Sequence, residues 1–259
     1  MPTFSVPGAV LDVELSDEGG HPVVQLHGLT SSRRRDRLLD LDLGRGLSGT
    51  RLLRYDARGH GRSTGRAVAE DYRWHAIADD LLALLDAWLP GEAVHGVGPS
   101  MGCATLLHAA VKDPERFTSL TLLVPPTAWE TRQAKAADYL RAADIVERIG
   151  MDAFVQASRM VPRPPATAGT PETVPDVSEE LLPSLMRGAA LSDLPPREAI
   201  AGIDVPVTIL AWIDDPTHPV STAEALAHLL PNARLEVART PHDVARWPEV
   251  LCEDVARHG

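Results

Sequence analysis

Seven short apolar runs constrain the fold of this chain more than any other feature, because most of them end in a polar or glycine-containing turn. The runs are Val10–Leu15, Val23–Leu26, Leu52–Tyr55, Ala93–Val97, Ser119–Val124, Val207–Ile213 and Leu235–Ala238. Helical patterns at Trp74–Leu89, Ala104–Val111, Ser221–Leu230 and Trp247–Arg257 alternate with them. This alternation is typical of an α/β fold. We predict a mostly parallel twisted sheet with helices on both faces and Val10–Leu15 as an outer antiparallel strand.

One stretch interrupts this alternation. Between residues 126 and 202 there is no convincing strand, and the helical patterns are Glu130–Ile149, Met151–Met160 and Ser178–Leu191. The segment Pro162–Pro175 contains five prolines and no apolar periodicity, which predicts an irregular loop. We therefore predict a core formed by residues 1–125 and 203–259, with residues 126–202 inserted as a small helical cap over the edge of the sheet where ligands of such folds bind.

Composition excludes several classes of function. The chain has 259 residues, a formal net charge of −11 and 24% charged residues, so it lacks the basic surface of a nucleic-acid or anionic-membrane binder. No apolar run approaches the roughly 18 residues of a membrane span, and no secretory signal is visible. The two cysteines cannot form a disulfide framework. We expect a cytoplasmic protein whose partner is a small-molecule substrate.

The basic run Arg33-Arg34-Arg35 contrasts with this acidic composition. Charge runs usually face water, so we interpret it as a solvated loop. The alternative is that these arginines steer an anionic substrate toward a site.

The most informative motif is Gly98-Pro99-Ser100-Met101-Gly102. A strand pattern precedes it and a helix of small residues follows it, which is the setting of a nucleophilic serine on a tight strand-to-helix turn. The glycines remove side chains that would collide in such a turn, and the helix N-terminus offers backbone N–H groups to developing negative charge. The alternative is a glycine-rich turn in which Ser100 only caps the helix.

Together with two further segments, this motif resembles the α/β-hydrolase fold family along nearly the whole chain outside residues 126–202. His27-Gly28-Leu29 is similar to the family's oxyanion segment, and the string from Asp56 to Ser63 resembles its D-x-R-G-x-G-x-S turn. The resemblance implies that the insertion follows the family's sixth strand. It also implies a Ser…Asp…His triad in that chain order.

Ser100, Asp215 and His242 fit the three triad positions. Asp215 stands four residues before a proline, as the family's acid commonly does, whereas the adjacent Asp214 is one residue out of register. His242 follows the last strand, where the family's general base lies. Pro241 precedes it where glycine is common, so we expect this loop to differ in geometry from that of relatives.

Three other histidines lie near these motifs. His27 and His60 resemble family positions that support loops at the site, and we expect them to make structural hydrogen bonds. His218 stands beside the acid, where it would line the entrance.

The resemblance implies a serine hydrolase that cleaves a small-molecule carboxylic ester or lactone through an acyl-serine. Backbone N–H groups of Leu29 and Met101 would bind the oxyanion. We expect no cofactor, and no His/Cys/carboxylate spacing suggests a metal. Two alternatives stay open, namely a carbon–carbon bond hydrolase and a ligand-binding protein with an idle triad.

The apolar side chains of the insertion are the candidates for a substrate pocket. They are Trp129, Tyr139, Met151, Phe154, Met160 and Met186. The alternative is that they form only the small core of the cap itself.

Overall fold

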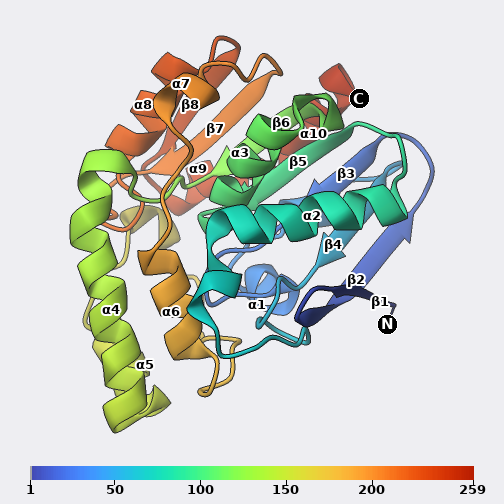
Figure 1. Cartoon of the computed structure of the whole chain (residues 1–259). Helices are drawn as coiled ribbons and strands as arrows, with labels where there is room; N and C mark the ends of the chain where they lie inside the picture. Colours follow the sequence, from blue (N-terminus) through green and yellow to red (C-terminus); the bar gives the residue numbers. More distant parts are fainter. Residues whose placement is uncertain (1) are drawn as a thin grey trace.

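The computed structural model describes residues 2–259 and contains one eight-stranded sheet. The strands lie in the order β1-β2-β4-β3-β5-β6-β7-β8 (Figure 1). Their bounds are β1 Thr3–Val6, β2 Ala9–Asp17, β3 Pro22–Gln25, β4 Arg51–Tyr55, β5 Val94–Pro99, β6 Phe117–Leu123, β7 Val207–Trp212 and β8 Ala233–Ala238. The α/β fold with a mostly parallel sheet is therefore confirmed.

The strand directions follow the prediction closely. β2 pairs antiparallel with β4, and every pair from β4–β3 to β7–β8 is parallel. The short strand β1, which pairs antiparallel with β2 at the sheet edge, was not predicted. Because β3 to β8 all run the same way, the turns after them meet at one edge of the sheet.

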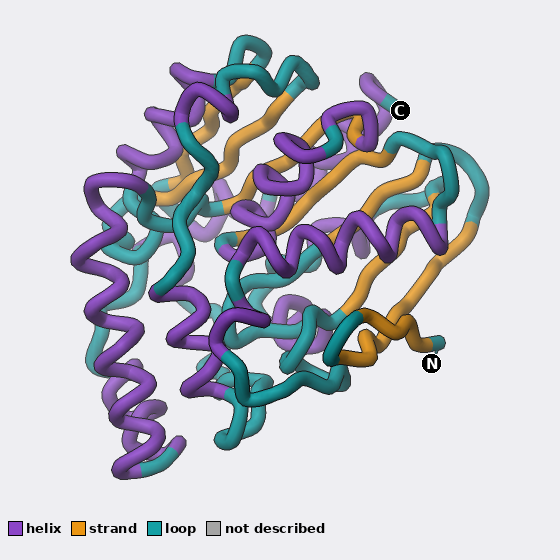
Figure 2. Tube along the Cα trace, in the orientation of Figure 1, coloured by secondary structure: helices purple, strands orange, loops and turns teal. Residues whose placement is uncertain are grey.

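Helices cover both faces of the sheet (Figure 2). Buried side chains of α2, α3 and α8 share one apolar cluster with the strands, and those of α10 belong to a second cluster on the opposite face. The helices are α1 Arg33–Leu38, α2 Trp74–Trp88, α3 Met101–Lys112, α4 Arg132–Ile149, α5 Met151–Arg159, α6 Leu182–Ala190, α7 Arg197–Ile200, α8 Val220–Leu229, α9 Pro241–Ala245 and α10 Trp247–His258. Within residues 2–259, none is both long and apolar enough to cross a bilayer.

The predicted helical insertion lies between β6 and β7. Helices α4, α5 and α6 lie together beyond the carboxyl ends of the parallel strands (Figure 1). Buried side chains of α4 and α6, including Tyr139, Val146, Leu182 and Met186, form a third apolar cluster. The insertion thus has a small core of its own. The division of the chain at residues 126 and 202 stays a prediction.

The proline-rich segment 162–175 is irregular, as predicted, apart from the 3₁₀ helix η5 (Pro165–Thr167). η5 packs against α9, and Ala166 is buried in the apolar cluster that contains Trp247 and Leu251 of α10. Proline cannot donate to a backbone ladder, which accounts for the lack of regular structure. The segment therefore connects the insertion to the face of the sheet that α10 covers.

The interpretation of Arg33-Arg34-Arg35 as a solvated loop is wrong. These residues open helix α1, where Ser32 is the N-cap and accepts a hydrogen bond from the backbone N–H of Arg35. Arg33 is buried, and its side chain pairs with Asp12 and Asp56. Only Arg34 is largely exposed, with 79% of its side chain accessible. The buried carboxylates, which lie far away in the sequence, draw Arg33 inward.

We expect Arg33→Met to lower the free energy of unfolding by about 3–5 kcal/mol, because it leaves Asp12 and Asp56 as buried charges without their cation. The matched control is Arg34→Met, which should change it by less than about 0.5 kcal/mol. Urea unfolding of both variants provides the measurement. Equal losses in the two variants would contradict this role for Arg33.

Candidate active site

Ser100 lies on a strained turn between β5 and α3. Its backbone has φ 52° and ψ −107°, a conformation that few non-glycine residues adopt. Gly98 and Gly102 make the turn possible, since a Cβ on Gly98 would lie 3.0 Å from Leu26 Cβ and one on Gly102 would lie 2.9 Å from it. The predicted strand–turn–helix setting of Ser100 is thus present.

The turn after β3 runs beside Ser100. A Cβ on Gly28 would lie 3.8 Å from Ser100 Cβ, which places the following residue, Leu29, at the same site. Within residues 2–259, the backbone N–H groups of Leu29 and Met101 donate no hydrogen bond. Met101 is the first residue of α3, where backbone N–H groups have no acceptor within the helix. Both groups are therefore available as hydrogen-bond donors.

The carboxylate predicted from the family spacing is held rigidly after β7. Asp215 Oδ1 accepts from the backbone N–H of Thr217, and Oδ2 accepts from Trp212 Nε1, each at 2.8 Å. Burial alone would raise the pKa of Asp215, but the hydrogen bonds from His218, Trp212 and Thr217 outweigh it and hold this pKa well below its ordinary value. Asp214 is exposed, and its side chain has no hydrogen-bond partner among residues 2–259.

His218 joins Ser100 to Asp215. Its Nδ1 lies 2.7 Å from Asp215 Oδ2, and its Nε2 lies 2.8 Å from Ser100 Oγ. Because an ionised carboxylate can only accept a hydrogen bond, Nδ1 carries the proton and donates a hydrogen bond to Asp215. Nε2 then accepts a hydrogen bond from the Ser100 hydroxyl, so this tautomer is poised to take a proton from Ser100.

The structure does not bring His242 to Ser100. Thr240 caps α9, Pro241 is the first residue of the helix, and Asp243 Oδ2 accepts from the backbone N–H of Thr240 at 2.9 Å. This capping box places His242 in the first turn of the helix, where its side chain is exposed. The geometric change that Pro241 predicted is therefore large enough to separate this histidine from the site.

A local signal could have identified His218. In Asp215-Pro216-Thr217-His218 the first carboxylate accepts from the backbone of residues two and three further on, which is typical of an aspartate that begins a turn. That turn folds the fourth side chain back onto the carboxylate. In addition, Thr240 followed by Pro241 and Asp243 is the sequence of a capped helix start, which argues against a loop at His242.

The insertion supports the turn that carries His218. Lys135 of α4 donates from Nζ to Thr217 Oγ1 at 3.0 Å, and the backbone N–H of Thr127 donates to the carbonyl of Thr217 at 3.1 Å. Trp212 contacts His218 edge-on and stacks on Trp247 of α10. The insertion thus holds the turn that carries His218, and Trp212 of β7 contacts the imidazole itself.

A cavity of about 230 Å³ opens at Ser100 and His218. Three of the six predicted pocket residues line it: Tyr139, Phe154 and Met186. The other three lie elsewhere. Trp129 donates from Nε1 to the carbonyl of Pro195, Met151 packs in the apolar cluster of the insertion, and Met160 is 84% exposed.

His27 and His60 make the structural contacts expected of them. His27 Nε2 accepts from the backbone N–H of Ala57 at 2.9 Å, and Nδ1 donates to the carbonyl of Gly28 at 2.8 Å. Burial lowers the pKa of His27 and that of His60, the latter to about 3, so both are neutral at pH 7. They tie the turn after β4 to the turn after β3.

Asp36 is a buried carboxyl at the wall of the same cavity. Ser31 Oγ donates to Asp36 Oδ1 at 2.5 Å. Burial raises the pKa of Asp36 to about 7, although the hydrogen bond from Ser31 and the charge of Arg35 oppose the shift. The protonated acid is therefore strongly populated near neutral pH.

The chain belongs to the α/β-hydrolase fold family. The family model described as alpha/beta hydrolase fold matches residues 21–146. The chain is 30% identical to 3-oxoadipate enol-lactonase 2 of Acinetobacter baylyi over 199 residues, which are 73% of this chain and 70% of that protein. It is 28% identical to a putative carbamate hydrolase, RutD, of Caulobacter sp., over 83% of this chain and 85% of that protein.

Solved structures show the same fold. A thermophilic esterase from Thermogutta terrifontis superposes with a TM-score of 0.76 at 22% identity, covering 99% of this chain and 97% of that one. The enol-lactonase of Burkholderia xenovorans superposes with a TM-score of 0.77 at 21% identity, covering 99% of both chains. These likenesses show that the chain shares the fold of these two proteins.

The raised pKa of Asp36 predicts a pH-dependent loss of stability. Its pKa is about 7 in the folded chain and near its ordinary value of 3.8 in the unfolded chain. Between about pH 4 and pH 7 the folded state holds the extra proton, so stability falls as pH rises through this window and levels off above it. Each pKa unit corresponds to about 1.4 kcal/mol.

The variant Asp36→Asn imitates the protonated acid and should not show this loss. Relative to wild type, its free energy of unfolding should increase by a few kcal/mol, on the order of the shift above, from pH 4 to pH 7. Urea unfolding of both proteins at several pH values measures the difference between their free energies of unfolding. The contributions of the other carboxyl groups are the same in both proteins and cancel in this difference. A difference independent of pH would show that Asp36 is ionised when folded.

Proposed function

We propose that this protein is a serine hydrolase of small carboxylic esters or lactones, in which Ser100 is the nucleophile, His218 the general base and Asp215 the acid of the triad. The observation that carries the proposal is the position of His218, which lies within hydrogen-bond distance of both Ser100 Oγ and Asp215 Oδ2. The relationship to enol-lactonases and esterases supports the substrate class.

The first step forms an acyl-serine. His218 Nε2 takes the proton of Ser100 while Oγ attacks the substrate carbonyl, and Asp215 stabilises the imidazolium through Nδ1–H. The low pKa of Asp215 keeps it ionised, so it orients the imidazole and does not itself take the proton. When the tetrahedral intermediate collapses, His218 returns the proton to the leaving alkoxide.

The oxyanion would be bound by the backbone N–H groups of Leu29 and Met101. Both are without an acceptor in the described part of the chain, and Met101 adds the positive end of the α3 dipole. Loss of one such donor typically costs about 3–4 kcal/mol of transition-state stabilisation.

The second step releases the acid and restores the serine. Water, deprotonated by His218, attacks the acyl carbonyl, and the proton then passes to Ser100 as the ester bond to Oγ breaks. In a lactone the leaving alkoxide stays attached to the acyl group, so a single product results. The cavity of about 230 Å³, walled by Tyr139, Phe154 and Met186, suits a small apolar acyl or alcohol part.

A matched pair of histidine variants tests the proposal. His218→Ala should lower kcat for a short-chain aryl ester by at least about 10³-fold, and Ser100→Ala and the double variant should lose similar amounts because the triad acts as a unit. His242→Ala should stay within about twofold of wild type, since its side chain is exposed in α9. A greater loss in His242→Ala than in His218→Ala would overturn the assignment.

A second pair compares the adjacent aspartates. Asp215→Asn should lower kcat by about 10³–10⁴-fold, because an amide favours the wrong His218 tautomer. Asp214→Asn should have little effect, since Asp214 makes no side-chain hydrogen bond within residues 2–259. Steady-state kinetics, with circular dichroism to establish folding, provide the measurement. Comparable losses would mean that the carboxylate does not act through His218.

A further inference from the structure

A second cavity adjoins the one at Ser100. It has a volume of about 300 Å³ and lies between α1, α5 and the proline-rich segment 162–175. Thr30, Arg35, Leu39 and Phe154 line both cavities, so the two are neighbours across these four residues. A ligand at Ser100 could therefore extend into the second cavity, which we call the arginine cleft.

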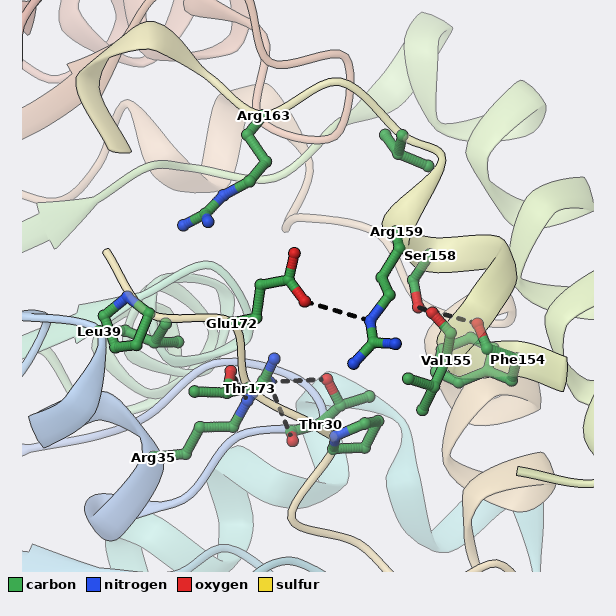
Figure 3. A pocket seen from close by; sticks show the side chains of 13 residues that line it. Thr30, Arg35, Leu39, Phe154, Val155, Ser158, Arg159, Arg163, Glu172 and Thr173 are labelled. Carbon is green, nitrogen blue, oxygen red and sulfur yellow. Dashed lines mark hydrogen bonds and ion pairs between the residues drawn. The ribbon is translucent and has the colours of Figure 1, made fainter. Parts of the chain in front are cut away.

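The arginine cleft is positively charged in a strongly acidic chain. Arg35, Arg159 and Arg163 line it from three different segments, and Glu172 is its one carboxylate. In Figure 3 these arginines surround Glu172, which pairs with Arg159 at 3.3 Å. The net charge of the chain is −11, so the cleft is a local exception to a surface that repels anions.

Arg35 differs from the other arginines of α1 in its partners. Arg33, Arg34 and Arg37 each lie within 4 Å of a carboxylate. Arg35 has no such neighbour in the described part of the chain. Its Nε donates to Thr173 Oγ1 at 2.9 Å, and Nη1 donates to the carbonyl and hydroxyl oxygens of Thr30, each at 3.2 Å.

Arg35 therefore lacks a direct ion pair at the junction of the two cavities, although Asp36 and Asp176 act on its charge from beyond 4 Å. Its side chain is partly buried, and removal of a cation from water is unfavourable unless an anion accompanies it. The bonds to Thr30 and Thr173 fix Nε and Nη1, while Nη2 donates to no protein atom among residues 2–259. The guanidinium is thus held in place with Nη2 left to donate, and a carboxylate oxygen is a suitable acceptor for this charged donor.

We infer that the arginine cleft binds a carboxylate carried by the substrate, with Arg35 as the specificity-determining residue. The substrate class is an ester or lactone with an ionised carboxylate several bonds from the scissile carbonyl. The carbonyl lies at Ser100 and the carboxylate at Arg35. This inference rests on the proposed hydrolase function only for the placement of the scissile carbonyl at Ser100. Glu172 already neutralises Arg159, which favours a singly charged group over a phosphate dianion.

A pair of esters that differ in charge tests the inference. The substrates are 4-nitrophenyl hydrogen succinate and the neutral 4-nitrophenyl pentanoate, which has similar size, with rates corrected for uncatalysed hydrolysis. Arg35→Gln should lower the ratio of kcat/KM for the anionic ester to that for the neutral one by about 10–100-fold, the usual effect of a hydrogen bond to a charged group. Arg35→Lys should restore part of that ratio.

Arg34→Gln is the matched control, because Arg34 is the exposed neighbour in the same helix and should leave the ratio within about twofold. Added salt should lower the wild-type ratio and have less effect in Arg35→Gln. If Arg35→Gln lowers both kcat/KM values equally, the arginine only ties Thr173 to Thr30, and the inference is wrong. A wild-type preference for the neutral ester would also contradict it.

A binding measurement separates this inference from the proposed function. Titration of Ser100→Ala with methyl hydrogen succinate and with dimethyl succinate requires no turnover. Tighter binding of the monoanion, lost in Ser100→Ala/Arg35→Gln, supports the carboxylate site even if no ester is hydrolysed. If the protein hydrolyses esters but shows no preference for the anion, in binding or in kcat/KM, the carboxylate site is excluded. The proposed hydrolase function is not contradicted by that result.

Discussion

The close approach of two strand ends is the constraint on which the candidate site depends. The Ser100 turn can lie against the end of β3 only because Gly98 and Gly102 have no side chain to meet Leu26. That contact places the turn that carries Leu29 beside Ser100, whose backbone has a positive φ of 52°. Thr30 and Val124, which line the same cavity, also have positive φ values. Three of the six non-glycine residues with positive φ in the described part of the chain thus line the cavity at Ser100.

The carboxylate and the histidine of the candidate site, Asp215 and His218, belong to one turn. Asp215 and His218 are three residues apart, so the geometry of the pair is set locally and does not depend on the position of a distant loop. The insertion reinforces this turn through Lys135, and the stacked pair Trp212 and Trp247 supports it from the sheet. The segment around His242 is consequently free to form a capped helix that packs against η5. Substitutions in α4 should therefore affect the imidazole as well as the pocket.

Sequence patterns predicted the sheet, its main helices, the insertion and the setting of Ser100, because apolar periodicity and glycine positions are local properties. They failed where burial depends on distant partners. Arg33 seemed solvated because nothing near it in sequence shows that Asp12 and Asp56 would bury it. His242 was preferred over His218 by position in the family pattern, while the capping residues Thr240 and Asp243 determined the structure of that segment. Trp129, Met151 and Met160 have suitable chemistry for a pocket, but only packing decides which side chains face it.

We propose above all that His218 is the general base for Ser100. A crystal structure of the protein after reaction with a small serine-directed phosphonate tests it most directly, because the adduct imitates the tetrahedral intermediate. We expect His218 Nε2 to lie within about 3 Å of Ser100 Oγ or of a phosphonate oxygen. We also expect the backbone N–H groups of Leu29 and Met101 to donate to the phosphoryl oxygen, with His242 still exposed in α9. An adduct in which His242 contacts the phosphonate and His218 has turned away would contradict the account.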